Sequence, residues 1–162
     1  MNYRVDVNDE YKRAKSTFLK YSLIFSLILT LVIVGDTLLI VLAKGDYTIN
    51  LIIAIIITIL FGWFAIFFFT SIFNDINSRY RYFKGYEGGL KPTEEIEFLK
   101  KSDELCYING LYVYPVYVRY FVGLSVQDKV IFTFKNNLDY EMGDKLTITT
   151  YQRILIEAEK HQ

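Results

Sequence analysis

Side chains that could carry out chemistry are few and scattered in this 162-residue chain. His161 is the only histidine and Cys106 the only cysteine, and neither belongs to a spacing such as H-x-x-H or C-x-x-C. A metal site of the ordinary type therefore has too few ligands, and a single cysteine excludes an internal disulfide. Adjacent acids such as Glu94 and Glu95 lie in charged segments, where solvation is the usual role. We expect no cofactor and no enzymatic activity.

The most unusual ionisable residue is Asp36, the one acid inside two long apolar runs, Tyr21–Ala43 and Asn50–Phe73. An acid near the centre of a membrane helix costs about 2.5 to 3.5 kcal/mol. One interpretation is a proton or cation site, or a docking point for a partner's basic residue. The other is an acid that is protonated, or hydrogen-bonded to Thr58 or Thr37, and that holds the hairpin or a dimer together.

The two apolar runs are long enough to cross a bilayer. At about 1.5 Å per residue each reaches about 33 to 36 Å, against a hydrocarbon core of about 30 Å. Lys44–Ile49, with Gly45 and Asp46, suits a short turn between them. The sequence predicts a membrane α-helical hairpin of two transmembrane helices over residues 21–73.

Basic residues flank the hairpin on one side. The N-terminal arm 1–20 and the segment after the second run are basic, whereas the turn offers only Lys44 beside Asp46. Because basic loops stay in the cytoplasm, both termini are predicted to be cytoplasmic, with the protein in the plasma or inner membrane.

Each predicted helix has a stripe of small and hydroxyl residues. The first stripe is Ser22, Ser26, Thr30 and Thr37; the second is Ala54, Thr58, Gly62 and Ala65. Small residues let helices approach closely in lipid. We therefore expect the two stripes to face each other, with Asp36 at the depth of Thr58.

Residues 74–91 form a predicted juxtamembrane helix and glycine-rich linker. Arg79, Arg81 and Lys84 would lie among lipid headgroups, where cations meet anionic lipid. Gly85, Gly88 and Gly89 then predict a helix break and a flexible joint.

Residues 92–162 are predicted to form a small α+β cytosolic domain. Thr93 resembles a helix N-cap, with acids after it and lysines later, which predicts a short helix over 93–103. About five strands follow, at 105–108, 111–122, 130–135, 145–151 and 154–158. Asn109-Gly110 and Gln152-Arg153 predict tight turns. For so few residues we expect a strongly curled sheet or a small barrel of the OB or SH3 kind, with one short helix.

The longest predicted strand, 111–122, is apolar on both faces, so we expect it to be covered on both sides. Its aromatic and basic side chains form a candidate partner or ligand face: Tyr112, Tyr117, Arg119 and Tyr120. Such residues could stack on and charge-pair a nucleotide, or simply pack in a core or an interface.

Two resemblances add expectations. The ending Gly143–Glu157 (GDKLTITTYQRILIE) resembles the close of the OB-like barrels that follow the membrane helices of NfeD-type proteins. The layout of two helices before a β-rich domain is similar to that of the two-helix, β-strand-rich effectors of bacterial cyclic-oligonucleotide defence systems. That second resemblance implies a barrel that binds the messenger and helices that then assemble and disrupt the membrane.

Two functional hypotheses remain open. The first is a non-enzymatic membrane protein of bacterial type, an accessory subunit, scaffold or regulator whose β domain binds a protein partner or another copy. The second is an effector whose β domain senses a nucleotide second messenger, such as a cyclic nucleotide, and drives oligomerisation. The balance of eighteen basic and eighteen acidic residues gives no reason to expect nucleic acid as a partner.

Overall fold

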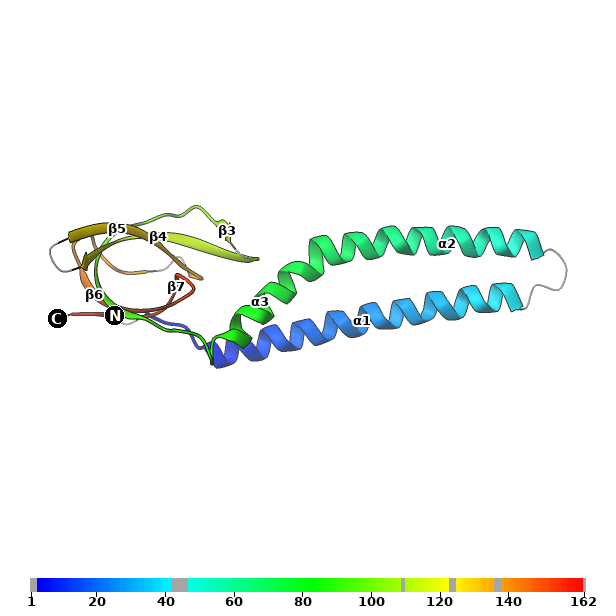
Figure 1. Ribbon diagram of the computed structural model, residues 1–162, viewed down its shortest axis with the longest axis horizontal. Helices are drawn as coiled ribbons and strands as arrows, with labels where there is room; N and C mark the ends of the chain where they lie inside the picture. Colours follow the sequence, from blue (N-terminus) through cyan, green and yellow to red (C-terminus); the bar gives the residue numbers. More distant parts are fainter. Residues whose placement is uncertain (1–2, 42–46, 109, 123–124, 136–137, 162) are drawn as a thin grey trace. The chain divides into compact units, whose positions relative to one another are not determined.

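A computed structural model describes residues 3–41, 47–108, 110–122, 125–135 and 138–161 (Figure 1). The chain divides into two compact units, Met1–Lys12 with Arg81–Gln162, and Arg13–Tyr80. The first is a β domain and the second is helical, and each is described by itself.

Two long helices dominate the helical part. α1 spans Val7–Val41, and α2 (Tyr47–Phe67) continues through the π-helix η1 (Phe68–Phe73) into α3 (Asn74–Gly85). Both helices, of 35 and 39 residues, are long and apolar enough to cross a membrane. The predicted pair of apolar helices is therefore present. Lys44–Asp46 of the predicted turn lie outside the described residues, and Tyr47–Ile49 belong to α2.

The contact between α1 and α2 uses only part of the predicted stripes: Ala54 is 5% exposed, and Ala65 and Ser22 are half-buried. The less exposed residues of α1 recur at spacings of four and three: Ala14, Phe18, Tyr21, Phe25, Ile28, Val32, Gly35 and Leu39. This is the seam of a coiled coil. Ser26, Thr30, Thr58 and Gly62 are exposed, so the predicted packing face is corrected. The Thr30 hydroxyl donates to the Ser26 carbonyl at 2.9 Å, so it needs no partner across the seam.

Aromatic rings fill the half of this seam nearer η1 and α3. Phe25 of α1 stacks on Phe68 at 5.0 Å between ring centroids, and Phe18 stacks on Tyr80 at 4.8 Å. Such ring pairs contribute about 0.5 to 1.5 kcal/mol beyond their area. Bulky rings therefore share the contact with the small residues Ala54 and Ala65, while Ser26, Thr30 and Gly62 stay outside it.

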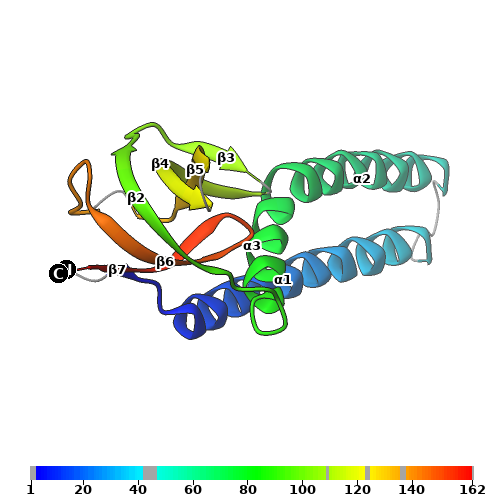
Figure 2. The ribbon, with the colours of Figure 1, turned by 60° about the vertical axis from the view of Figure 1, so that its left-hand side comes forward.

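The β domain contains a seven-stranded mixed sheet. Its strands are β1 (Tyr3–Arg4), β2 (Thr93–Lys101), β3 (Cys106–Ile108), β4 (Leu111–Val122), β5 (Ser125–Thr133), β6 (Lys145–Tyr151) and β7 (Ile154–Lys160). The pairings β2–β4, β4–β5, β5–β7, β7–β6 and β6–β2 close a ring of strands, and only β5–β7 is parallel (Figure 2).

The segment predicted as a helix over 93–103 is strand β2, so that prediction was wrong. Ile96 and Phe98 point into the barrel core, and Glu97 between them is less buried. β2 pairs with β4 on one edge and with β6 on the other. These hydrogen bonds to two strands stabilise the extended form more than the Thr93 cap and the order of acids and lysines would stabilise a helix. β5 also begins earlier than predicted, at Ser125.

Both predicted tight turns lie between paired strands. Gln152 and Arg153 have φ of 50° and 66°, as a type I′ hairpin requires, and join β6 to β7. Ile108 and Leu111 are register partners in the β3–β4 hairpin, in which Gly110 has φ 81°. Asn109 itself lies outside the described residues.

The N-terminal residues complete the barrel, a role that the predicted separate arm 1–20 did not include. β1 pairs with β7, and the Val5 N–H donates to the Ile156 carbonyl at 2.9 Å. The Thr133 hydroxyl donates to the Tyr3 hydroxyl at 2.9 Å, and the Tyr3 N–H donates to the Tyr140 hydroxyl at 3.1 Å. These bonds close the region where β5 and β7 pair at one position only.

The end of α3 is embedded in the β domain. Phe83 is 2% exposed and packs against Phe134 at 5.6 Å, and the Tyr82 hydroxyl donates to the Tyr151 carbonyl at 3.0 Å. Burial and the neighbouring Tyr151 hold the pKa of Tyr82 well above its ordinary value. The last turn of the helix is thus part of the barrel's packing.

The glycine run after α3 is a cradle for Tyr151 as well as a helix break. A Cβ at Gly89 would overlap Tyr151 Cε2, and one at Gly85 would lie 2.8 Å from its Oη. The absence of side chains therefore lets the backbone pass directly over the Tyr151 ring. The predicted helix break is present, but the two glycines are packed positions.

We expect Gly89→Ala to destabilise the β domain by about 1 to 3 kcal/mol, the range of an overpacked core. Gly88→Ala is the matched control, because a Cβ there meets nothing within 4 Å. Thermal unfolding of the full chain in detergent measures both variants. Equal melting temperatures would contradict the cradle.

Candidate functional site

Strand β4 presents two different faces. Val116, Val118 and Tyr120 point into the barrel core, while Tyr117, Arg119 and Phe121 point outward. The outward residues of its first half, Leu111 and Val113, are buried. The expected cover on both sides is therefore absent: the first half of β4 is buried on the Leu111–Val113 side while Tyr112 is exposed, and the second half has an accessible outer face.

The four residues of the predicted candidate face do not lie together. Tyr117 and Arg119 share the outer face, whereas Tyr120 is 6% exposed inside the barrel. Tyr112 is on the same side of β4 as Tyr120 but lies beyond the core, where it is exposed. Its ring packs on that of Tyr107, with 5.0 Å between the ring centroids. Only Tyr117 and Arg119 can therefore contact one ligand across the outer face.

Arg119 is held by carboxylates on both neighbouring strands. Its Nε lies 2.9 Å from Asp128 Oδ1 on β5, and its Nη1 lies 3.8 Å from Glu97 Oε2 on β2. The hydrogen bond and charge of Asp128, then the charge of Glu97, raise the pKa of Arg119. The charge of Arg119 is thus compensated by its own neighbours, and Lys100 Nζ, 4.7 Å from the centroid of the Tyr117 ring, is a further cation beside this ion pair.

Apolar side chains flank this ion pair along β4 and β5. Phe121 and Val126 are register partners and are 51% and 57% exposed, and Tyr117 faces Val130. We call Tyr117, Arg119, Phe121, Val126, Asp128 and Val130 the outer β4–β5 face. It combines exposed apolar groups with an internally compensated charge, as the contact surfaces of proteins often do.

A pocket of about 510 Å³ opens at the end of the barrel. Tyr120, Ile96 and Leu146 line it, with Glu94 and Lys145 among its charged groups. Burial, followed by the charge of Glu94, raises the pKa of Tyr120 to about 12. Sequence reasoning missed this pocket because its residues come from β2, β4 and β6 and converge only through the strand register.

In the helical unit, Asp36 lies beside Thr58. The Thr58 hydroxyl donates to Asp36 Oδ2 at 2.8 Å, the hydrogen bond that the antiparallel register predicts. Asp36 Oδ1 is buried and has no hydrogen-bond partner among the described residues. The pair links α1 to α2 and offers one free lone-pair site.

The remaining predicted residues carry no assembled site. Arg79, Arg81 and Lys84 are exposed along α3, as headgroup contacts require. Across the described ranges, no three histidine, cysteine, aspartate or glutamate side chains are grouped as a metal site needs.

Thr58→Val should weaken the pairing of α1 with α2 by about 0.6 to 1.7 kcal/mol, the size of interhelical hydrogen bonds in membranes. Thr37→Val is the matched control, because the Thr37 hydroxyl donates at 2.8 Å to Ile33 O within its own helix. Unfolding of the helical part in bicelles measures the difference. If both variants behave alike, the Asp36–Thr58 bond does not fasten the hairpin.

The β domain should lose stability as the pH rises from about 10 to about 12. An unfolded tyrosine ionises near pH 10, but buried Tyr120 keeps its proton to a higher pH, so the unfolded state gains from deprotonation first. Tyr120→Phe should reduce the slope of unfolding free energy against pH in this window. An unchanged slope in denaturant titrations at pH 9, 10 and 11 would contradict the burial of the phenol.

Comparison with known proteins places this chain in no family. No protein-family model, curated protein or solved structure matches it. The proposals that follow therefore rest on the geometry of its own residues.

Proposed function

We propose that this chain is a non-enzymatic integral membrane protein that acts as an accessory subunit, scaffold or regulator. Its two helices anchor it in the bilayer, and its β domain binds a protein partner or another copy. The outer β4–β5 face is the observation that carries this proposal.

Membrane anchoring is supported by exposure along the helices. Leu23, Leu31 and Trp63 are among many large apolar side chains there, at 68%, 64% and 71% exposed. Lipid is the solvent in which such a surface is stable. Basic residues precede the apolar part of α1 and follow that of α2, both at the terminal end of the pair, and by the positive-inside rule they favour a cytoplasmic position for the termini and the β domain, at the plasma or inner membrane.

A protein partner suits the outer β4–β5 face better than a nucleotide does. Nucleotide phosphates need a surplus of positive charge, whereas Arg119 is already compensated by Asp128 and Glu97. Exposed Phe121 and Val126 offer apolar area to a protein surface. The exposed Arg79, Arg81 and Lys84 are assigned to anionic lipid headgroups.

The strand order supports assigning the ring to the OB class. Taking β2, β4, β5, β6 and β7 as strands one to five, the order 1-2-3-5-4-1 with a parallel closure is that of a five-stranded Greek-key barrel. This order is also the one observation that favours the second candidate, a nucleotide-messenger effector, because OB barrels bind oligonucleotides on strands two and three.

Mass spectrometry of the intact complex, purified from native membranes in mild detergent, tests the proposal. A stoichiometric protein partner, or a defined homo-oligomer that the Phe121→Ser variant dissociates, is the expected result. Lys91→Ser is the control, because Lys91 is exposed outside the outer β4–β5 face. A monomer that instead binds a cyclic dinucleotide with loss in Arg119→Ala would replace this proposal by the messenger effector.

A further inference from the structure

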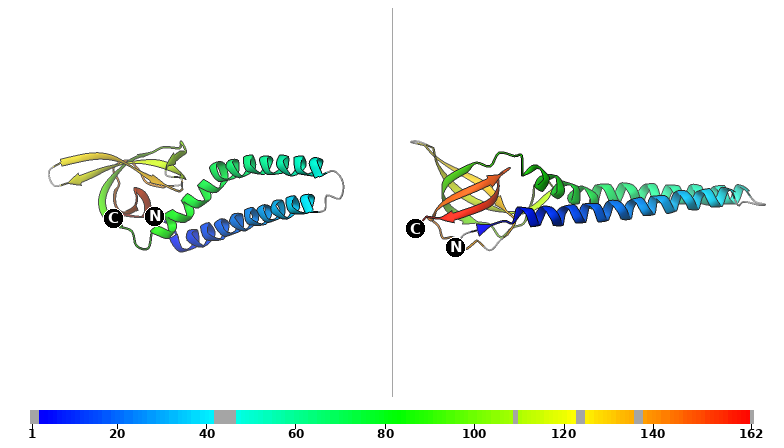
Figure 3. Two further views of the ribbon diagram at one scale, coloured as in Figure 1. Left: turned by 45° about the vertical axis from the view of Figure 1, so that its right-hand side comes forward. Right: turned by 90° about the horizontal axis from the view of Figure 1, so that it is seen from below.

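Strand β5 has an open edge. β4 pairs with β5 from Tyr114–Thr133 to Val122–Ser125, but on the other edge the described residues pair only at Phe132, with Ile154 of β7. Residues 125–130 are exposed throughout. In Figure 3 the β4–β5 hairpin reaches beyond the rest of the barrel.

The backbone groups on that open edge can be identified. The Phe132 N–H donates to Arg153 O at 2.8 Å, so the backbone N–H of Phe132 points away from β4. Its register partner is Pro115, which has no N–H and whose carbonyl accepts from Ser102 at 2.9 Å. Pro115–Phe132 is therefore a non-hydrogen-bonded pair, and alternation turns the N–H and C=O groups of Val126, Asp128 and Val130 outward.

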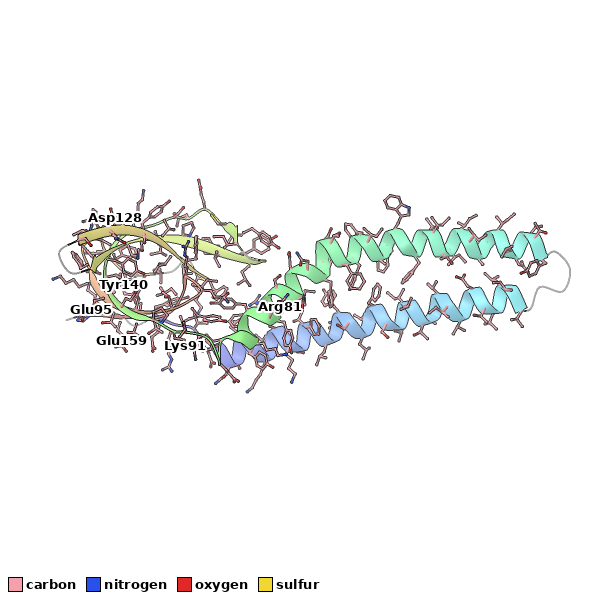
Figure 4. The ribbon with its side chains drawn as sticks, viewed as in Figure 1. Arg81, Lys91, Glu95, Asp128, Tyr140 and Glu159 are labelled. Atoms are coloured by element: carbon pink, nitrogen blue, oxygen red, sulfur yellow. The ribbon has the colours of Figure 1, made fainter. Side chains whose placement is uncertain are left out.

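The same three residues carry the outer-face side chains of β5. A strand added beside β5 would continue three cross-strand rows, which begin with Phe121–Val126, Arg119–Asp128 and Tyr117–Val130. The first and third rows are apolar. The middle row contains the Asp128 carboxylate, which remains 57% exposed beside Arg119 (Figure 4).

Charge selects the occupant of this edge. Among the three outward residues of β5, Asp128 alone is charged and its side chain is 57% exposed, so a cation is favoured directly opposite it. A second β5 strand that matched valine to valine across the edge, Val126 to Val130, would place Asp128 opposite its own copy. Such like-charge pairs disfavour self-association.

We infer that the open edge of β5 docks an extended strand of a partner protein whose alternate residues are apolar, basic and apolar. Main-chain bonds to Val126, Asp128 and Val130 supply affinity, and the basic residue opposite Asp128 supplies specificity. This inference rests on the proposed partner-binding function and names the chemistry of the partner.

Two synthetic peptides test the inference on the full chain in detergent micelles. The probe is acetyl-Thr-Val-Thr-Lys-Thr-Val-Thr-amide, and its control carries glutamate in place of lysine. We expect the lysine peptide to bind about ten-fold more tightly by fluorescence anisotropy. Equal binding of the two peptides, or no binding of either, would overturn the inference.

Proline variants test the edge itself. Val130→Pro removes an N–H that points away from β4, so the β4–β5 ladder keeps its bonds while the docking edge loses one. Val130→Thr is the matched control with the N–H intact, and Val126→Pro repeats the test nearer the hairpin end if Val130→Pro unfolds. We expect a loss of peptide binding of at least about ten-fold in a folded proline variant only. Retained binding there would show that the edge is not the site.

Charge specificity has its own variant. Asp128→Asn should bring the lysine and glutamate peptides to within about two-fold of each other. A native partner that stays bound to folded Val130→Pro in the intact-complex measurement would reject the edge while leaving the proposed function standing. Absence of any partner of the wild-type chain would reject the function instead.

Discussion

The β domain depends on the packing of one side chain, Tyr151, at the end of β6. Its ring lies under the backbone of Gly85 and Gly89, and its carbonyl accepts the Tyr82 hydroxyl. Any larger residue at Gly89 would have to displace the ring, and the turn after β6 would move with it. Because Tyr82 and Phe83 belong to α3, the last turn of an apolar helix is held by the same contacts that hold the barrel.

The N-terminal strand applies the same constraint from the other end of the chain. Residues before α1 pair with β7, and Tyr3 and Tyr140 close the region where β5 leaves β7. Two segments far apart in sequence therefore meet on β7 and at the β6–β7 turn. The β domain is therefore built from both ends of the chain, and neither β1 nor the last turn of α3 can be removed without exposing part of its packing.

Much of this fold could be predicted from local patterns. Apolar length indicated both helices, the content of β-branched and aromatic residues indicated β4 and β6 with their observed bounds, and the Gln152-Arg153 turn followed from its length. Counting residues from the predicted turn along both antiparallel helices predicted that Thr58 lies beside Asp36, as it does. Each of these depends on residues close in sequence or on simple helical geometry.

What escaped prediction depends on partners distant in sequence. Thr93 and its acids resemble a helix start, and only pairing with β4 and β6 makes the segment a strand. The residues of α1 that contact α2 are set by the aromatic rings that pack between the two helices, so Ser26 and Thr30 remain exposed. The charge at the candidate site could not be predicted, because Glu97 and Asp128 reach Arg119 only through the register of two different strand pairs.

The open edge of β5 also shows how a strand can be accessible without pairing with every extended chain. Exposed edges invite pairing with any extended chain, and charged residues on the edge are the usual protection. Here Asp128 lies between two valines, where it disfavours an identical strand and an acidic one. Lys129 on the opposite face lies over the Tyr120 ring, 4.7 Å from its centroid, so its charge is directed away from the outer face. An edge with one exposed carboxylate between apolar neighbours is selective by its own chemistry, because it disfavours strands that place an acid opposite Asp128.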